Sequence, residues 1–456
     1  MENTQGTINH SNLSSVVCQH ALMKKFPVLP PELVHEILGY LKDDPSGSGT
    51  IDLIACSLVS ITWYQQARLL LGENPFEPLT KARVPREYDL VRAVELLVES
   101  RRLGLDYCDR ITELNISIDA LTSDPSGLKP HGYIPEHAEA YRTVLRVAPK
   151  INVLCVDMTW YFNIYTSACL RKIYAFFDSI IPLCGRVTGL RFTRDTCIEI
   201  VEFMPRFIET FADRLVLFQT DLIYFNDPLL QQALRLCTQM RDVEFANTDI
   251  NDLADVVPYW PHLRTFRGYH DPEIGDINVD SLVYKLAKFC MHLEEAVLVN
   301  DDLATCFDVT DTAMCFLLKH CPNLRHLAVA GHRLTDEFLH VAKTALPQLE
   351  RLSIKGCPRI WGDVVAGKAW PELKELELEG CGSLEWKFVQ GVIDGCPALK
   401  AVRLPGHFNE EMAQGFMMPL EFECGAAKEV GRRWWWCSDP LAYRHPVRGS
   451  AIWRRS

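Results

Sequence analysis

Apolar residues recur every three or four positions in the N-terminal part of the chain, which is the spacing of amphipathic helices. The first such stripe follows the proline pair at 30–31 and consists of Leu33, Val34, Ile37, Leu38 and Leu41. A loop over 43–50, rich in Gly and Ser, separates it from two further stripes at 51–59 and 63–71. The pattern predicts three short helices. Such a small module commonly needs a partner to cover its apolar surface.

The three predicted helices carry an ordered motif. It reads Leu29-Pro30-x-Glu32-Leu33-x-x-x-Ile37-Leu38-x-x-Leu41, followed by Ala55-Cys56-Ser57-Leu58-Val59-Ser60-x-x-Trp63-Tyr64-x-x-Ala67-Arg68. Over residues 26 to about 72 this order resembles an F-box, in the version common in fungal F-box proteins with repeats. The loop at 43–50 is a departure, because it is longer and richer in Gly and Ser than is usual.

The resemblance implies that this module binds the Skp-type adaptor of cullin–RING ubiquitin ligases. Carried over by position, the implied contacts are Leu29, Pro30, Leu33, Ile37, Leu38, Leu58, Val59 and Trp63. The alternative is that these side chains are the internal core of an ordinary helical cap, and Trp63 and Leu58 could serve both roles. Leu29 and Pro30 precede the helix, so contact with a partner is favoured for them.

A different pattern recurs farther along the chain. Cys or Pro is followed by an apolar residue, then by a second one three positions later that opens a short apolar strand. The best copies lie at 321–329, 347–354, 371–378 and 396–402, and looser copies centre on Ile111, Ile151, Val187, Met240, Leu263 and Leu293. The last spacings, 24–26 residues, fit a leucine-rich repeat. The gap of 53 residues after Val187 indicates a hidden copy near Leu215-Val-Leu217.

Each repeat is expected to contain a strand and a helix. The strand points its leucines into a core that neighbouring repeats extend. Thr335 begins one predicted helix, with Asp336 and Glu337 in its first turn and Pro347 beyond its end. The pattern resembles the cysteine-containing repeats often found behind F-boxes.

The predicted fold is therefore α/β: a short three-helix N-terminal F-box followed by a right-handed α/β leucine-rich-repeat solenoid of the RNI-like type. The expected organisation is a disordered segment at 1–24, the F-box at 25–75, a helical bridging segment at 76–105, the solenoid at 106–410 and a C-terminal cap or tail at 411–456. The tail contains Trp434, Trp435 and Trp436 and is rich in Arg. It is interpreted as a cap over the last repeat, with target binding as the alternative.

Composition narrows the class of protein. The net charge of −12 argues against nucleic-acid binding, which needs a basic face. The chain has 17 cysteines, an odd number, and neither a signal-peptide-type run nor a stretch of about 18 apolar residues. We therefore expect reduced thiols, no membrane segment and a cytoplasmic or nuclear location.

The sequence contains only weak signals for a metal site or a catalytic site. Metal-ligand residue types gather at Cys306, Cys315, His320, Cys321 and His326, but without the paired spacing of a metal site. Nucleophile-elbow and phosphate-loop motifs are missing from the sequence. We expect no catalytic residue, no metal and no cofactor.

The expected function is that of a non-enzymatic substrate adaptor of an SCF-type ubiquitin ligase. The target protein, of unknown identity, is expected on the concave face of the repeats. The alternative is a leucine-rich-repeat scaffold outside ubiquitin ligation. Candidate target-facing positions are Arg325, His326, Glu350, Arg351, Lys374, Glu375, Lys400 and Ala401. Because these residues carry charges of both signs, they indicate no particular class of target.

Overall fold

The computed structural model describes residues 29–42, 49–71, 76, 79, 90–122, 133–157, 167–193, 203–221, 227–246, 250–270, 277–300, 307–363, 370–405, 408, 422–425 and 452–455. The chain divides into two compact units, Met1–Pro75 and Phe76–Ser456. The segment at 1–24, expected to be disordered, and the tryptophans at 434–436 lie outside the described residues.

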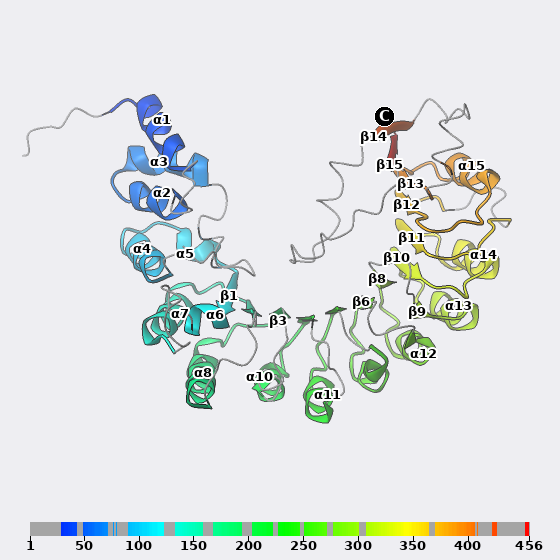
Figure 1. The fold of residues 1–456 in the computed structure, drawn as a ribbon, viewed down its shortest axis with the longest axis horizontal. Coiled ribbons are helices and arrows are strands. Elements are labelled where there is room, and N and C mark those ends of the chain that lie inside the picture. Colours follow the sequence, from blue (N-terminus) through cyan, green and yellow to red (C-terminus); the bar gives the residue numbers. More distant parts are fainter. Residues whose placement is uncertain are drawn as a thin grey trace, which may run out of the picture. The chain divides into compact units, whose positions relative to one another are not determined.

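The first unit contains the three helices that the sequence predicts: α1 (Pro31–Lys42), α2 (Gly49–Ser57) and α3 (Ile61–Leu71) (Figure 1). Helix α1 starts at a proline, whose missing N–H costs nothing in a first turn. The Ser60 hydroxyl accepts from the backbone N–H of Trp63 at 3.3 Å at the start of α3. The core consists of Val34, Leu38, Leu53 and Ala67, with Leu41, Cys56, Trp63, Leu70 and Leu71 packed around it.

The second unit is a solenoid whose strands form one sheet. Eleven parallel strands stand in chain order: β1 (Glu113–Ser117), β2 (Val153–Asp157), β3 (Gly189–Thr193), β4 (Leu217–Thr220), β5 (Asp242–Ala246), β6 (Thr265–His270), β8 (Glu295–Asn300), β10 (His326–Ala330), β11 (Arg351–Lys355), β12 (Glu375–Glu377) and β13 (Ala401–Arg403). Two antiparallel strands, β15 (Ile452–Arg455) and β14 (Phe422–Gly425), follow β13 at the end of the sheet. A separate parallel pair is formed by β7 (Ile277–Asn278) and β9 (Phe307–Asp308).

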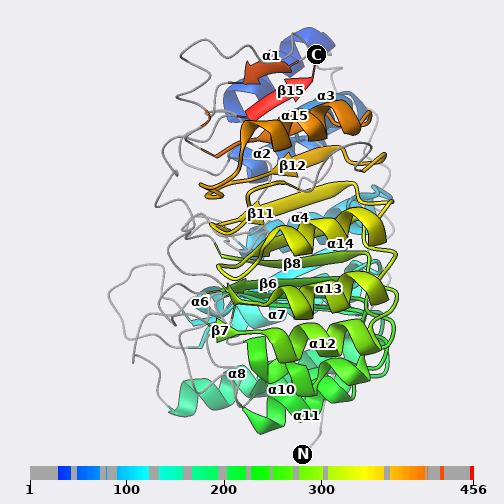
Figure 2. The ribbon, with the colours of Figure 1, turned by 90° about the vertical axis from the view of Figure 1, so that its right-hand side faces the viewer.

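Helices cover one face of this sheet. They are α4 (Leu90–Arg102), α5 (Tyr107–Arg110), α6 (Ile118–Thr122), α7 (Pro135–Val147), α8 (Ser167–Ile180), α10 (Phe203–Phe211), α11 (Pro228–Arg235), α12 (Asp280–Phe289), α13 (Asp311–His320), α14 (Asp336–Ala345) and α15 (Trp386–Gly395), with the 3-10 helices η4 (Ile181–Leu183), η5 (Ile250–Asp255) and η6 (Val257–Tyr259). Figure 2 shows α12 to α15 stacked in front of their strands. In Figure 1 the strands of this unit line its inner, concave side. The predicted α/β leucine-rich-repeat solenoid is confirmed.

The alternation of the strands builds the core. Leu352 and Ile354 of β11 are buried beneath the helices. The register places Leu327, Leu352, Leu376 and Val402 in one row across four strands. Side chains at the positions between them lie on the concave face of the sheet.

The hidden repeat is also confirmed, since β4 stands between β3 and β5. Here phenylalanines fill core positions in two neighbouring rows, with Phe218 and Phe266 in the row of Leu327 and Phe245 in the row of Val329. The Phe218 and Phe245 rings are 5.8 Å apart, and those of Phe245 and Phe266 are 6.4 Å apart. A pattern built on leucine therefore matches these middle repeats poorly.

Consecutive repeats are joined at the starts of their helices. The carboxylate of Asp280 accepts from the backbone N–H and the hydroxyl of Thr310, both at 2.9 Å. Asp311 accepts in the same way from Thr335, at 2.9 and 2.5 Å. Thr335 in turn caps α14, as predicted, by accepting from the N–H of Glu337. This Asp–Thr clasp fixes the start of α12 to that of α13, and the start of α13 to that of α14.

The repeat cysteines are buried packing residues. The thiol of Cys321 donates to the carbonyl of Cys290, and that of Cys290 donates to the carbonyl of Trp260, both at 3.6 Å. Burial raises the pKa of Cys321 to about 12. Twelve of the cysteines in the described ranges are free thiols.

Candidate interaction surfaces

Helix α1 presents a second apolar face, beside the face that packs in the core of the first unit. Val34 and Leu38 are fully buried, whereas Leu29, just before the helix, and Leu33 and Ile37 are 39–47% exposed. Tyr40 continues the same stripe at 75% exposure. Because the stripe has helical spacing, these side chains lie on one side of the helix. We call Leu29, Leu33, Ile37 and Tyr40 the α1 stripe.

The eight residues implied by the F-box resemblance divide between surface and core. Five of them are exposed: Leu29, Pro30, Leu33, Ile37 and Val59. Leu58 and Trp63 are partly buried, and Trp63 packs on the core. Leu38 is the exception, because it is fully buried and so belongs to the internal-core alternative. Sequence reasoning missed Tyr40, although its distance of three residues from Ile37 was a usable signal.

The concave face of the solenoid carries a first ionic cluster on β5 to β10. Arg267 donates to Glu295 at 2.7 Å and lies 3.5 Å from Glu244. His326 Nδ1 is 3.1 Å from the same Glu295 carboxylate. Burial alone would raise the pKa of Glu295, but hydrogen bonds from His326 and Arg267 outweigh it and lower the pKa to about 2. For Glu244 burial prevails and raises the pKa.

A second ionic cluster occupies β11 to β13. Glu377 accepts from Ser353 at 2.9 Å and from Arg403. Lys355 is nearly buried and lies 3.7 Å from Glu377 and 3.6 Å from Glu379. These charged side chains form ion pairs with one another between neighbouring strands. Their main effect is to hold the strand register, because breaking such a pair would leave a buried charge.

An apolar patch continues the concave face beyond Glu295 and His326 on the same two strands. Val297, Val299, Ala328 and Ala330 point to the concave side of β8 and β10 and are packed with Tyr269. On these strands the concave face therefore changes from charged at the strand start to apolar farther along.

The eight predicted target-facing positions fall into two adjacent rows. Arg325, Glu350, Lys374 and Lys400 stand directly before β10 to β13, and His326, Arg351, Glu375 and Ala401 are the first residues of those strands. Parallel strands in register bring together residues that lie about one repeat apart in the sequence.

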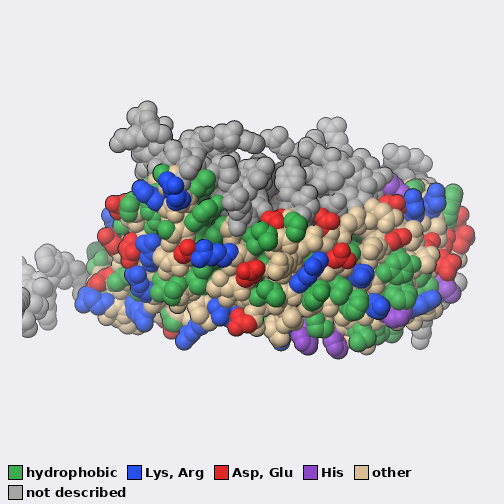
Figure 3. Space-filling model, turned by 90° about the horizontal axis from the view of Figure 1, so that it is seen from below, with side chains coloured by type: hydrophobic (Ala, Val, Ile, Leu, Met, Phe, Trp, Pro, Cys, Tyr) green, Lys and Arg blue, Asp and Glu red, His purple; other side chains and the backbone are tan. Residues whose placement is uncertain are grey.

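The opposite, helix-covered side has a mixed surface. Figure 3 shows Lys and Arg intermixed there with Asp and Glu, and hydrophobic side chains scattered among them. One aromatic group crosses α12 and α13, where the ring of Phe316 is 5.3 Å from Tyr284 and 4.0 Å from His320. No single sign of charge dominates the described part of this side.

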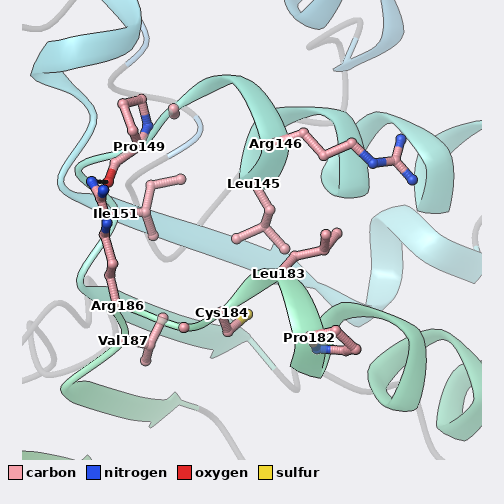
Figure 4. Close-up of a pocket in the computed structure, with 11 residues that line it drawn as sticks. Leu145, Arg146, Pro149, Ile151, Pro182, Leu183, Cys184, Arg186 and Val187 are labelled. Atoms are coloured by element: carbon pink, nitrogen blue, oxygen red, sulfur yellow. Dashed lines mark hydrogen bonds between the residues drawn. The ribbon is translucent and has the colours of Figure 1, made fainter.

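A cavity of about 310 Å³ lies between α7 and η4 (Figure 4). Its lining is mainly aliphatic, with Leu145, Ile151, Leu183 and Val187. Arg186 donates across it to the carbonyl of Pro149 at 2.7 Å. The Cys184 thiol is buried, which raises its pKa to about 12 and removes its nucleophilic form at neutral pH. The described lining offers no acid–base or nucleophile pair.

The cysteine–histidine candidates do not assemble. Cys306 lies outside the described residues. Cys315 and Cys321 are buried, His320 is exposed, and His326 belongs to the first ionic cluster. Within the described ranges, no three His, Cys, Asp or Glu side chains are grouped as a metal site. The helices that the structure describes include none long and apolar enough to span a bilayer.

No protein-family model matches the chain. Among solved structures, the chain is similar to one in the complex of Rad7 and Elc1 from yeast, with 14% identity over 69% of this chain and 83% of that chain and a TM-score of 0.42. It also resembles TLR13 in its complex with ssRNA13 (12% identity, 66% of this chain and 37% of that chain, TM-score 0.34). A leucine-rich-repeat protein of Leptospira interrogans gives 9% identity, 67% and 98% coverage and a TM-score of 0.22.

Proposed function

We propose that the protein is a non-catalytic substrate adaptor of a cullin–RING ubiquitin ligase. In this proposal the first unit binds a Skp-type adaptor, and the concave face of the solenoid binds the protein to be ubiquitinated. A cytoplasmic or nuclear location follows from such a role. The observation that carries the proposal is the α1 stripe, which consists largely of residues that also belong to the F-box-like motif.

The stripe supports binding because the core of the first unit is complete without it. Val34 and Leu38 already fill the interior side of α1. Leu33 and Ile37 remain 47% and 42% exposed, and this exposed apolar area gains nothing in solvent. Since less than half of each side chain is left to bury, contact with a partner would contribute roughly 0.6–1.4 kcal/mol for each. Several such anchors together can offset the entropy cost of association.

A pull-down with a Skp-type adaptor tests the proposal. We expect the wild-type chain to retain the adaptor and a Leu33→Ser/Ile37→Ser variant to lose it. Leu69→Ser is the matched control, because Leu69 is equally apolar, 69% exposed and outside the motif. Circular dichroism should show the same helix content for all three proteins.

The result that overturns the proposal is failure of the wild-type chain to retain the adaptor under conditions in which a known F-box protein does. That result would favour the alternative, a leucine-rich-repeat scaffold outside ubiquitin ligation. Equal loss of binding in the Leu69→Ser control would show that the α1 stripe is not the contact.

A further inference from the structure

The residues directly before the strands form a continuous row across the second unit. From each to the next runs a backbone N–H···O bond of 2.7–2.9 Å. The members in order are Thr112, Asn152, Thr188, Val216, Arg241, Arg264, Glu294, Arg325, Glu350, Lys374 and Lys400. The first four are uncharged and the last seven are all charged. The row therefore changes character between β4 and β5.

Three cations dominate its C-terminal part, and we call Arg325, Lys374 and Lys400 the basic row. The side chains of Arg325 and Lys374 are 57% and 41% exposed, and Lys400 is exposed as well. Within the described residues Lys400 makes no ion pair. A strip of exposed positive charge on a chain of net charge −12 is a local reversal of sign.

The one carboxylate within this strip is already neutralised. Glu350 accepts from Arg325 at 2.9 Å and from Lys374 at 2.6 Å. These hydrogen bonds lower the pKa of the Glu350 carboxyl. A guanidinium has five N–H donors and an ammonium three, so both cations keep donors for a further acceptor. Two cations share one anion, which leaves excess positive charge.

We infer that the basic row binds an acidic, extended segment of the target protein; this rests on the proposed function. The geometry suits such a segment. Strands are spaced about 4.8 Å apart, so the distance from Arg325 on the β10 side to Lys400 on the β13 side is about 14 Å. In an extended chain, acidic residues at three alternate positions span about 13 Å on one side.

A protein segment is favoured over a nucleic acid as the partner. Nucleic-acid binding surfaces combine several phosphate contacts with aromatic side chains on which bases stack. None of the eleven residues directly before the strands is aromatic. The net negative charge of the chain would also repel a long polyanion more strongly than a short acidic peptide.

The inference is tested with the full-length chain and a short fluorescein-labelled peptide that has glutamate at three alternate positions. At low salt we expect binding by fluorescence anisotropy, weakened by added salt and lost for the same peptide with lysine. Lys400→Glu should weaken binding about threefold to tenfold. Arg241→Glu is the matched control, because it reverses an exposed cation at the equivalent position before β5. It should change the affinity less than twofold.

Several outcomes overturn the inference. They are equal weakening by the two variants, equal binding of the lysine peptide, no binding by the wild type, and tighter binding of a single-stranded oligonucleotide that Lys400→Glu also weakens. The same samples separate this inference from the proposed function. Lys400→Glu should still retain the Skp-type adaptor, and Leu33→Ser/Ile37→Ser should still bind the peptide. If the wild-type chain binds the peptide but does not retain the adaptor, the proposed function is wrong and the inference of a peptide-binding surface is still supported.

Discussion

The two faces of α1 predict different losses of stability for substitutions at Leu38 and Leu33. Leu38 is fully buried in the core of the first unit, so Leu38→Ala leaves a cavity and should cost about 2–5 kcal/mol. A three-helix module of this size has at most about 3–5 kcal/mol of stability. The variant should therefore lose much or all of the stability of its first unit. Leu33 is 47% exposed, and Leu33→Ala should cost less than about 0.5 kcal/mol.

Hydrogen exchange followed by mass spectrometry measures the stability of the first unit in the full-length chain, because peptides from α1 to α3 report the opening of that unit alone. Since every 1.4 kcal/mol is a tenfold change, Leu38→Ala should accelerate their exchange at least roughly thirtyfold. Leu33→Ala should accelerate it less than about threefold. Peptides from β8 to β11 should exchange as in the wild type. Similar acceleration by both variants would refute the division of α1 into a core face and a partner face.

Three further predictions concern the solenoid. Asp311→Ala removes the acceptor from the capping threonine of the next helix and should cost about 1–3 kcal/mol in urea unfolding; an unchanged midpoint would contradict the clasp. The low pKa of Glu295 contributes stability that is present above its unfolded pKa of about 4.5 and is lost as the pH falls towards 2. The destabilisation caused by Glu295→Gln should therefore shrink across that range, and a constant difference would contradict it. Gly362 has a φ of 84°, and an added Cβ would clash with the side chain of Phe388, so Gly362→Ala should cost more than about 1 kcal/mol of stability. Gly382→Ala is the control, because an added Cβ there meets open space. Hydrogen exchange in α15 should be accelerated by the first substitution and not by the second.

The fold could be predicted where one residue type repeats at a fixed spacing. The leucine rows before and in β10 to β13 gave both the strands and their stacking. In the middle repeats the same row is filled by Phe218, Val243 and Phe266, and Phe245 lies in the next row of the core. These phenylalanine rings are buried like the leucines, but a pattern based on leucine does not detect them.

The candidate surfaces were harder to predict, for two physical reasons. In α1 five apolar residues follow one another so closely that periodicity cannot assign Leu33 to solvent and Val34 to the core. That assignment depends on where α3 packs. On the solenoid, Glu350 bonds Arg325 and Lys374, which lie 25 and 24 residues away. Only the strand register brings them together, so local sequence shows mixed charge where the structure shows a shared anion.

The Asp–Thr clasp also bears on how such a protein changes over evolutionary time. Thr310 and Thr335 are equivalent positions, each held by the aspartate that begins the preceding helix. A duplication or deletion whose ends fall at these threonines would restore the same clasp between the new neighbours. The solenoid could then grow or shorten by a whole repeat while its joints stay intact. The length of the concave face is therefore open to selection independently of the stability of each repeat.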